Sequence, residues 1–145
     1  MNPEQEAELC QLGPGVFSRI RSFGCDAGWF DLLEKLVVIL QAEIDRLPEA
    51  ERDQFYAVRV KEKFGGLQFY MNRGNAAMSA AIKRAEELSY KTCEECGAPG
   101  ECQTIRNWTQ TLCEVHKQEK IHKQEKLLET YLPFLKPVPK KPESP

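Results

Sequence analysis

The chain has 145 residues, of which 41% are hydrophobic and 29% charged, and its formal net charge is −2. This is the composition of a globular protein with one main domain, long enough to bury a core without disulfide bonds. No apolar run reaches the ~18 residues of a membrane span, and the acidic N-terminus lacks the basic and apolar regions of a signal peptide. We therefore expect a cytoplasmic protein with reduced thiols and no membrane partner.

Charge is unevenly distributed along the chain. The first 55 residues carry 11 acidic and 5 basic side chains, whereas residues 56–145 carry a small excess of basic ones. This gradient is compatible with a nucleic-acid or acidic-protein partner, but it falls well short of a strongly basic composition.

Residues 1–23 form an N-terminal segment in which the sequence predicts one short helix, Pro3–Leu12, ended by Gly-Pro-Gly. A core of helix, hairpin and helix is predicted over residues 24–91. Its first helix runs from Asp26 to Leu47, because apolar residues recur there every three or four positions. They are Trp29, Leu33, Leu36, Leu40, Ile44 and Leu47, and the stripe is broadened by Phe30, Val37 and Ile39.

Two alternating runs then predict a β-hairpin. Tyr56, Val58 and Val60 alternate with their neighbours in the first run, and Leu67, Phe69 and Met71 do so in the second. The connecting Lys-Glu-Lys-Phe-Gly-Gly contains glycines that suit a tight turn. Asn75 is a suitable N-cap for a second helix, which we expect to end near Tyr90. One face of that helix carries Met78, Ala81, Ile82, Ala85 and Leu88.

A cysteine-rich stretch follows. Cys93 and Cys96 have C-x2-C spacing, and sixteen residues later Cys113 and His116 have C-x2-H spacing. This pattern is typical of one zinc ion. A C-x2-C knuckle, a hairpin and a helix whose first turn supplies two ligands make a treble-clef-like zinc finger with a long terminal helix, which we expect over residues 92–132.

Two other side chains are candidates for the fourth ligand position. His122 lies six residues after His116, about 240° around the helix, and should point away from the ion. Cys102 falls in the predicted hairpin, where it is either a spare thiol or a substitute ligand. The distant Cys10 and Cys25 are expected to be small buried residues.

The metal is predicted to be structural. Three thiolates and an imidazole fill a tetrahedron, whereas a catalytic zinc keeps a position open for water. No deaminase pattern precedes the first Cys-x-x-Cys, and no nucleophile–base set can be assembled. Glu94, Glu95 and Glu114, which flank the ligands, are expected to be surface acids.

Several residues are candidates for contact with a phosphate or a protein partner. They are Lys61, Lys63, Gly65 and Gly66 in the first hairpin, Arg106 and Trp108 in the second, and Lys120 and Lys123 in the last helix. The alternative is that the glycines only serve the turn, that the tryptophan packs on the metal helix and that the lysines are solvated. The proline-rich residues 133–145 are predicted to be a disordered tail.

Five stretches together resemble a family of small, largely uncharacterised zinc-finger proteins of tailed phages, prophages and bacteria. They are Gly28-Trp29, Val60–Tyr70 (VKEKFGGLQFY), Ala85–Ser89, Thr92–Gly100 (TCEECGAPG) and Leu112–His116. The resemblance implies an accessory protein acting in a bacterial cytoplasm, that of the host if phage-encoded, and it singles out only the four zinc ligands.

The sequence therefore predicts an α+β protein that holds one structural Zn²⁺. We expect a non-enzymatic binding protein that modulates a bacterial protein target, for example as a counter-defence or host-takeover inhibitor. Nucleic-acid binding is the alternative, and capture of a nucleotide by the glycine hairpin is a weaker one. A small-molecule substrate is not expected.

Overall fold

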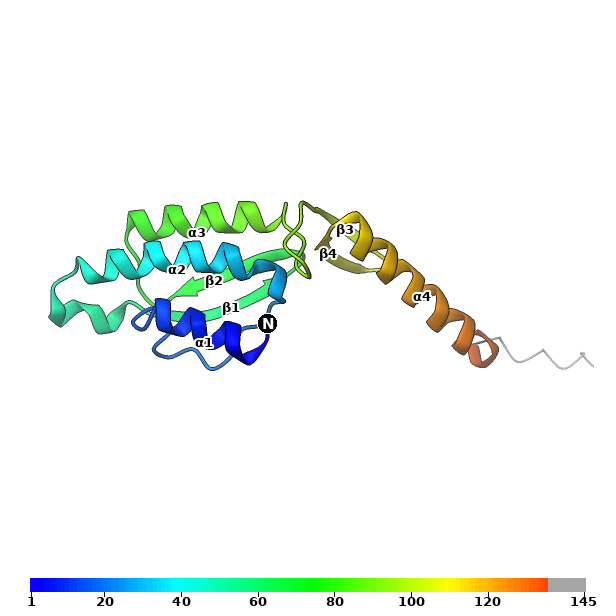
Figure 1. Ribbon diagram of the computed structural model, residues 1–145, viewed down its shortest axis with the longest axis horizontal. Helices are drawn as coiled ribbons and strands as arrows, with labels where there is room; N and C mark the ends of the chain where they lie inside the picture. Colours follow the sequence, from blue (N-terminus) through cyan, green and yellow to red (C-terminus); the bar gives the residue numbers. More distant parts are fainter. Residues whose placement is uncertain (136–145) are drawn as a thin grey trace, which may run out of the picture.

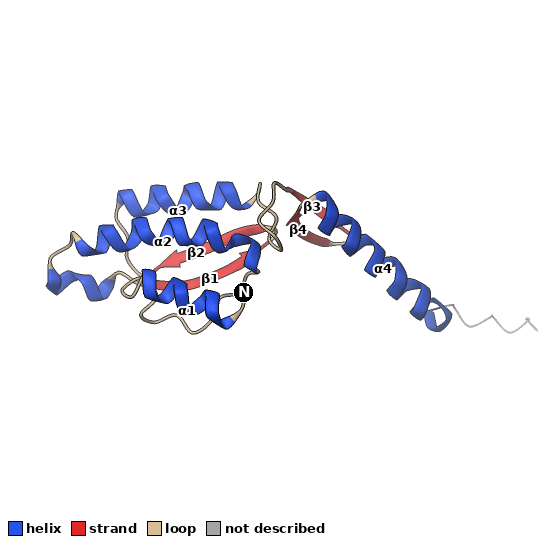
Figure 2. Cartoon of the chain, in the orientation of Figure 1, coloured by secondary structure: helices blue, strands red, loops and turns tan. Residues whose placement is uncertain are grey.

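The structure is a computed structural model that describes residues 1–135, and it is an α+β protein with two antiparallel hairpins (Figures 1 and 2). None of the helices in this range combines the length and apolar content needed to cross a bilayer. The elements are, in chain order, α1 (Pro3–Leu12), the 3-10 helix η1 (Ala27–Trp29), α2 (Phe30–Asp45), the 3-10 helix η2 (Glu49–Gln54), β1 (Ala57–Lys63), β2 (Gly66–Met71), α3 (Ala76–Ser89), β3 (Glu101–Ile105), β4 (Trp108–Leu112) and α4 (Glu114–Leu135).

The body, residues 1–91, is held by one hydrophobic core. The helix α2 contacts both α1 and α3, and α3 contacts β2 (Figure 1). The predicted N-cap of α3 is present, since Asn75 Oδ1 accepts from the Met78 amide at 2.9 Å. Fully buried side chains from the helices and the hairpin meet in this core. They include Leu9, Trp29, Leu33, Leu40, Val60, Phe69 and Met78.

The apolar face predicted for α2 is broader than the face that the structure buries. Val38 and Ile39 are 51% and 49% exposed, so the expectation that Ile39 is buried is wrong. Both positions lie beside the buried face of the helix, and Ile39 lines an open groove between α2 and α3.

The predicted alternation in β1 is also wrong at one residue. The register pairs Ala57 with Met71 and then Arg59 with Tyr70, so a β-bulge takes up Val58. An extra residue in one strand shifts the alternation of its side chains. Val58 is consequently 58% exposed, whereas Ala57 and Val60 are buried.

The C-terminal unit, residues 92–135, consists of the cysteine-bearing turn, the β3–β4 hairpin and α4. Figure 1 shows α4 extending away from the body. It includes Pro133 and ends at Leu135, so the predicted non-helical tail is wrong for its first three residues; residues 136–145 lie outside the described part of the chain. The proline lies in the last turn, where its missing N–H and its ring affect only the end of the helix.

The two hairpins contact each other through the turn of the first. Thr111 Oγ1 donates to the Gly65 carbonyl at 2.6 Å. A Cβ on Gly65 would come within 2.6 Å of Cys102 Sγ. The body and the C-terminal unit are therefore packed together at this point.

Candidate metal centre

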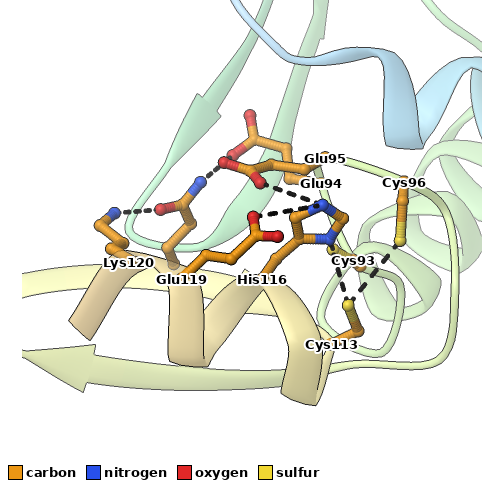
Figure 3. A network of polar contacts seen from close by, with 9 residues as sticks. Cys93, Glu94, Glu95, Cys96, Cys113, His116, Glu119 and Lys120 are labelled. Carbon is orange, nitrogen blue, oxygen red and sulfur yellow. Dashed lines mark hydrogen bonds and ion pairs between the residues drawn. The ribbon is translucent and has the colours of Figure 1, made fainter. Parts of the chain in front are cut away.

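Cys93, Cys96, Cys113 and His116 converge, and their ligand atoms all lie within 4.8 Å of one another (Figure 3). Cys96 Sγ is 3.8 Å from Cys113 Sγ, and His116 Nδ1 is 3.6 Å from Cys93 Sγ and 3.2 Å from Cys113 Sγ. Metal–sulfur bonds of about 2.3 Å and metal–nitrogen bonds of about 2.0 Å give tetrahedral edges of about 3.8 and 3.6 Å. The four residues could therefore hold one metal ion, as the sequence predicts.

The first two ligands lie on a tight turn. The Cys93 amide donates to the Ala98 carbonyl at 2.7 Å, and the Gly97 amide donates to the Cys93 carbonyl at 2.9 Å. Gly97 has a φ of +81°, which favours glycine. These two hydrogen bonds form the tight turn that carries the thiols of Cys93 and Cys96.

The other two ligands lie at the start of α4. Cys113 and His116 are three residues apart, so their side chains share one face of the first turn. The backbone amide of His116 lowers the pKa of the Cys113 thiol, with a smaller contribution from the amide of Val115. The helix start therefore favours the thiolate, which is the form that binds a metal.

The outer side of the His116 ring faces carboxylates. Nδ1 points to the sulfurs, and Nε2 lies 3.5 Å from Glu95 Oε2 and 4.0 Å from Glu119 Oε2 (Figure 3). If Nδ1 binds the ion, Nε2 carries the hydrogen and these carboxylates can accept it. Such a partner orients the ring and raises its basicity as a ligand.

Glu94 is not a surface acid, and that prediction is wrong. It is only 5% exposed, and its carboxylate accepts from the Asp26 amide at 3.2 Å and from Gln110 Nε2 at 3.2 Å. Burial raises its pKa to about 7, and repulsion from Asp26 and Glu62 adds to the effect of burial. No feature of the sequence distinguishes Glu94 from Glu95, because only the packing of the turn on the body buries one of them.

The ligand turn sits directly on η1, which leads into α2. The Gly28 amide donates to the Glu94 carbonyl at 2.6 Å, and Trp29 Nε1 donates to the Thr92 carbonyl at 3.0 Å. A Cβ on Gly28 would overlap the carbonyl oxygens of Cys93 and Glu94. Only glycine allows the two backbones to approach this closely.

The other cysteines and the second histidine are outside the cluster. Cys102 is exposed, with its Sγ 3.8 Å from the Phe64 carbonyl, and His122 is exposed on α4. Within the described residues neither is a fourth-ligand alternative. Cys25 is buried and Cys10 is partly buried, as expected.

The candidate contact residues of the first hairpin fall into two groups. Gly65 and Gly66 are buried, and the Gly65 amide donates to Glu62 Oε1 at 2.7 Å, which favours the interpretation that the glycines serve the turn. Lys61 and Lys63 lie on β1, with Lys61 half-buried and Lys63 exposed.

The candidates in the C-terminal unit lie on its hairpin and helix. The Lys120 ammonium is 4.9 Å from the centre of the Trp108 ring and donates to Gln110, so the structure brings these side chains together. Trp108 is 57% exposed, and Arg106 and Lys123 are also exposed.

Four ligands of this kind leave no position for a water or a substrate on a tetrahedral ion. The arrangement is therefore suited to holding the chain together. The chain matches no protein-family model, no curated protein and no solved structure. Its resemblance to phage and bacterial zinc-finger proteins stays a prediction.

Proposed function

We propose that the cluster holds one structural zinc ion and that residues 92–132 are a treble-clef finger. Three sulfurs and one imidazole nitrogen are a common ligand set for structural zinc. The order of ligand turn, β3–β4 hairpin and α4, with two ligands in the first turn of the helix, supports the treble-clef assignment.

The protein then acts as a non-enzymatic binding protein. The observation that carries this proposal is the closed set of four mutually adjacent ligand atoms. Three thiolates neutralise the charge of the ion and make it a weak Lewis acid. The binding energy of the metal goes into folding the C-terminal unit and keeping its turn docked on Gly28.

The target is proposed to be a bacterial protein, and the sequence resemblance is the basis for its bacterial origin. The exposed apolar side chains of α4 support a protein partner, because apolar groups clustered on a surface mark interaction sites. They are Leu127 (56% exposed), Leu128 (39%), Tyr131 (55%), Leu132 (51%) and Phe134 (83%).

The metal is tested by elemental analysis and cobalt substitution. We expect one zinc per chain, and Co²⁺ should give the intense d–d bands of a tetrahedral site together with thiolate charge-transfer bands. A well-folded protein without metal, or an ion carrying an exchangeable water, contradicts the structural role.

The partner surface is tested with two matched double variants of α4. Leu127→Ala with Tyr131→Ala removes apolar groups from one side of the helix, and Glu125→Ala with Glu129→Ala removes carboxylates from the other side. A bacterial protein retained by the wild type and the carboxylate variant, and lost by the apolar variant, supports the proposal. Equal retention by both variants contradicts it.

A further inference from the structure

One face of the β1–β2 hairpin points away from the core. Arg59 is paired directly with Tyr70, and Lys61 with Gln68. Directly opposed residues of an antiparallel pair project to the same face. The intervening Val60 is buried in the core, so these four side chains project to the other face, called here the outer face.

A cationic groove runs along the β1 edge of the outer face. The Gly24 amide donates to the Val60 carbonyl, and the Glu62 amide donates to the Gly24 carbonyl, each at 2.9 Å. This pairing lays residues 19–24 beside β1, and together they line a groove of about 480 Å³. Its cationic side chains are Arg19, Arg21, Arg59 and Lys61.

The cationic side chains of this groove form no ion pair with the described part of the chain. Within residues 1–135, none of the four cationic side chains has a carboxylate within 4.0 Å. The Arg19 guanidinium instead lies 4.3 Å from the centre of the Tyr56 ring. The first 55 residues are mostly acidic and contain five basic side chains, and two of these, Arg19 and Arg21, lie in the groove. The groove is therefore a local concentration of positive charge suited to phosphates.

A second hollow, of about 220 Å³, lies on the β2 side. Four aromatic residues contribute to its wall, namely Phe64, Phe69, Tyr70 and Tyr90. Phe64 is 71% exposed and has a φ of +52°, a conformation that a bulky side chain adopts only at a cost. Because its side chain is exposed, the Phe64 ring lies beside the hollow and not in the core.

Gln68 gives this hollow an unused polar group. Its side chain lines the hollow and is 9% exposed; Nε2 donates to the Tyr70 hydroxyl at 3.0 Å, and Oε1 has no partner. Whichever way round the amide is placed, one of its two polar atoms lacks a protein partner. A buried polar atom without a partner destabilises the protein, and a ligand that pairs with the atom can recover this loss.

We propose that the outer face binds single-stranded nucleic acid, with phosphates in the cationic groove and a base in the hollow beside Gln68. A cationic track next to aromatic rings is the general architecture of single-strand binding, and an amide can pair with the edge of a base. Groove and hollow lie on the two strands of one hairpin, and Lys61 of the groove is the cross-strand neighbour of Gln68 in the hollow. A duplex does not fit, since its bases are stacked and paired. This inference goes beyond the proposed function and uses neither the metal nor α4.

The proposal is tested by fluorescence anisotropy with the zinc-loaded full chain and labelled 12-nucleotide dT and U strands at 50 mM salt. We expect micromolar binding of the single strands and much weaker binding of a 12-base-pair duplex. Arg59→Gln with Lys61→Gln should weaken binding at least tenfold and reduce the slope of log K against log salt by about 1.4, or about 0.7 for each phosphate that is no longer neutralised. Tyr70→Ala should weaken binding about tenfold and leave the slope unchanged.

The matched control is Lys35→Gln with Lys126→Gln, which removes the same charge from exposed positions on α2 and α4 and should leave binding unchanged. Zinc content and Tm confirm that each variant is folded, and Arg19→Gln with Arg21→Gln provides a second groove variant. No binding up to about 100 µM protein would overturn the proposal. So would equal affinity for the duplex, or equal weakening by the groove and control variants. None of these results bears on the zinc site, so the proposed function would stand.

Discussion

Substituting Gly28 tests how tightly the ligand turn depends on the body. In Gly28→Ala, the new methyl group would overlap the carbonyl oxygens of Cys93 and Glu94. These are backbone atoms, so no side chain can rotate away, and the turn must move off the start of α2. That movement breaks the 2.6 Å hydrogen bond from the Gly28 amide to Glu94 and the 3.0 Å bond from Trp29 Nε1 to Thr92.

The cost has two parts. Overpacking of this kind costs about 1–3 kcal/mol, and each buried hydrogen bond contributes about 1 kcal/mol. We expect a loss of about 3–5 kcal/mol in the free energy of unfolding, which lowers Tm by about 6–20 °C in a chain of this length. Zinc should also be lost to a competing chelator at a lower chelator concentration, because two of its ligands lie on the displaced turn.

Gly74→Ala is the matched control. A Cβ on Gly74 would have Met78 Cβ as its nearest neighbour, at 3.9 Å, so we expect a change within about 0.5 kcal/mol. The reasoning is refuted if thermal unfolding and chelator competition give the same result for Gly28→Ala, Gly74→Ala and the wild type.

Three further predictions concern thiols and a buried acid. Cys93→Ser removes a fully buried ligand, so the protein should lose its zinc and the fold of residues 93–132. The amide NMR signals of the body should persist. A complete NMR spectrum with bound metal would show that the ligand set is wrong. Burial raises the pKa of the Cys25 thiol to about 12. Iodoacetamide at pH 8 should therefore modify Cys25 at least about 50-fold more slowly than the exposed Cys102. Similar rates of modification for the two cysteines would contradict this prediction. The pKa of Glu94 rises from about 4.3 in the unfolded chain to about 7 in the folded one. The folded state therefore binds this proton more tightly than the unfolded state does. The resulting contribution to the free energy of unfolding is fully present below pH about 4.3 and is lost as the pH rises to 7. Glu94→Gln should therefore gain stability relative to the wild type between pH 5 and 7.5 in urea unfolding of the zinc-saturated protein, and a constant difference would disprove the shift.

Two arginines of the cationic groove could not be predicted from the sequence. Arg19 and Arg21 lie in a segment with no periodic pattern, about 40 residues before the strand they flank. Only the pairing of Gly24 with β1 brings them to Arg59 and Lys61. The sequence predicted Lys61 but not the two arginines, and it added contact residues in the glycine turn, where the amide of Gly65 is bonded to Glu62.

Local patterns determined the elements and the metal ligands. The helix Pro3–Leu12, the capping by Asn75 and the Cys-x2-Cys and Cys-x2-His spacings all depend on residues within about one turn of each other, so the sequence alone predicts them. The outward position of Val58 depends on a bulge in the strand pairing.

Tertiary structure decided which side chains the folded chain buries. Glu94 and Glu95 are adjacent and chemically alike, yet only Glu94 lies against the start of α2, where it pairs with the Asp26 amide. Burial and charge neutralisation depend on neighbours brought together from distant parts of the chain. Spacing along the sequence therefore specifies the metal ligands, whereas the docking of the ligand turn on Gly28 and the assembly of the cationic groove arise only in the folded protein.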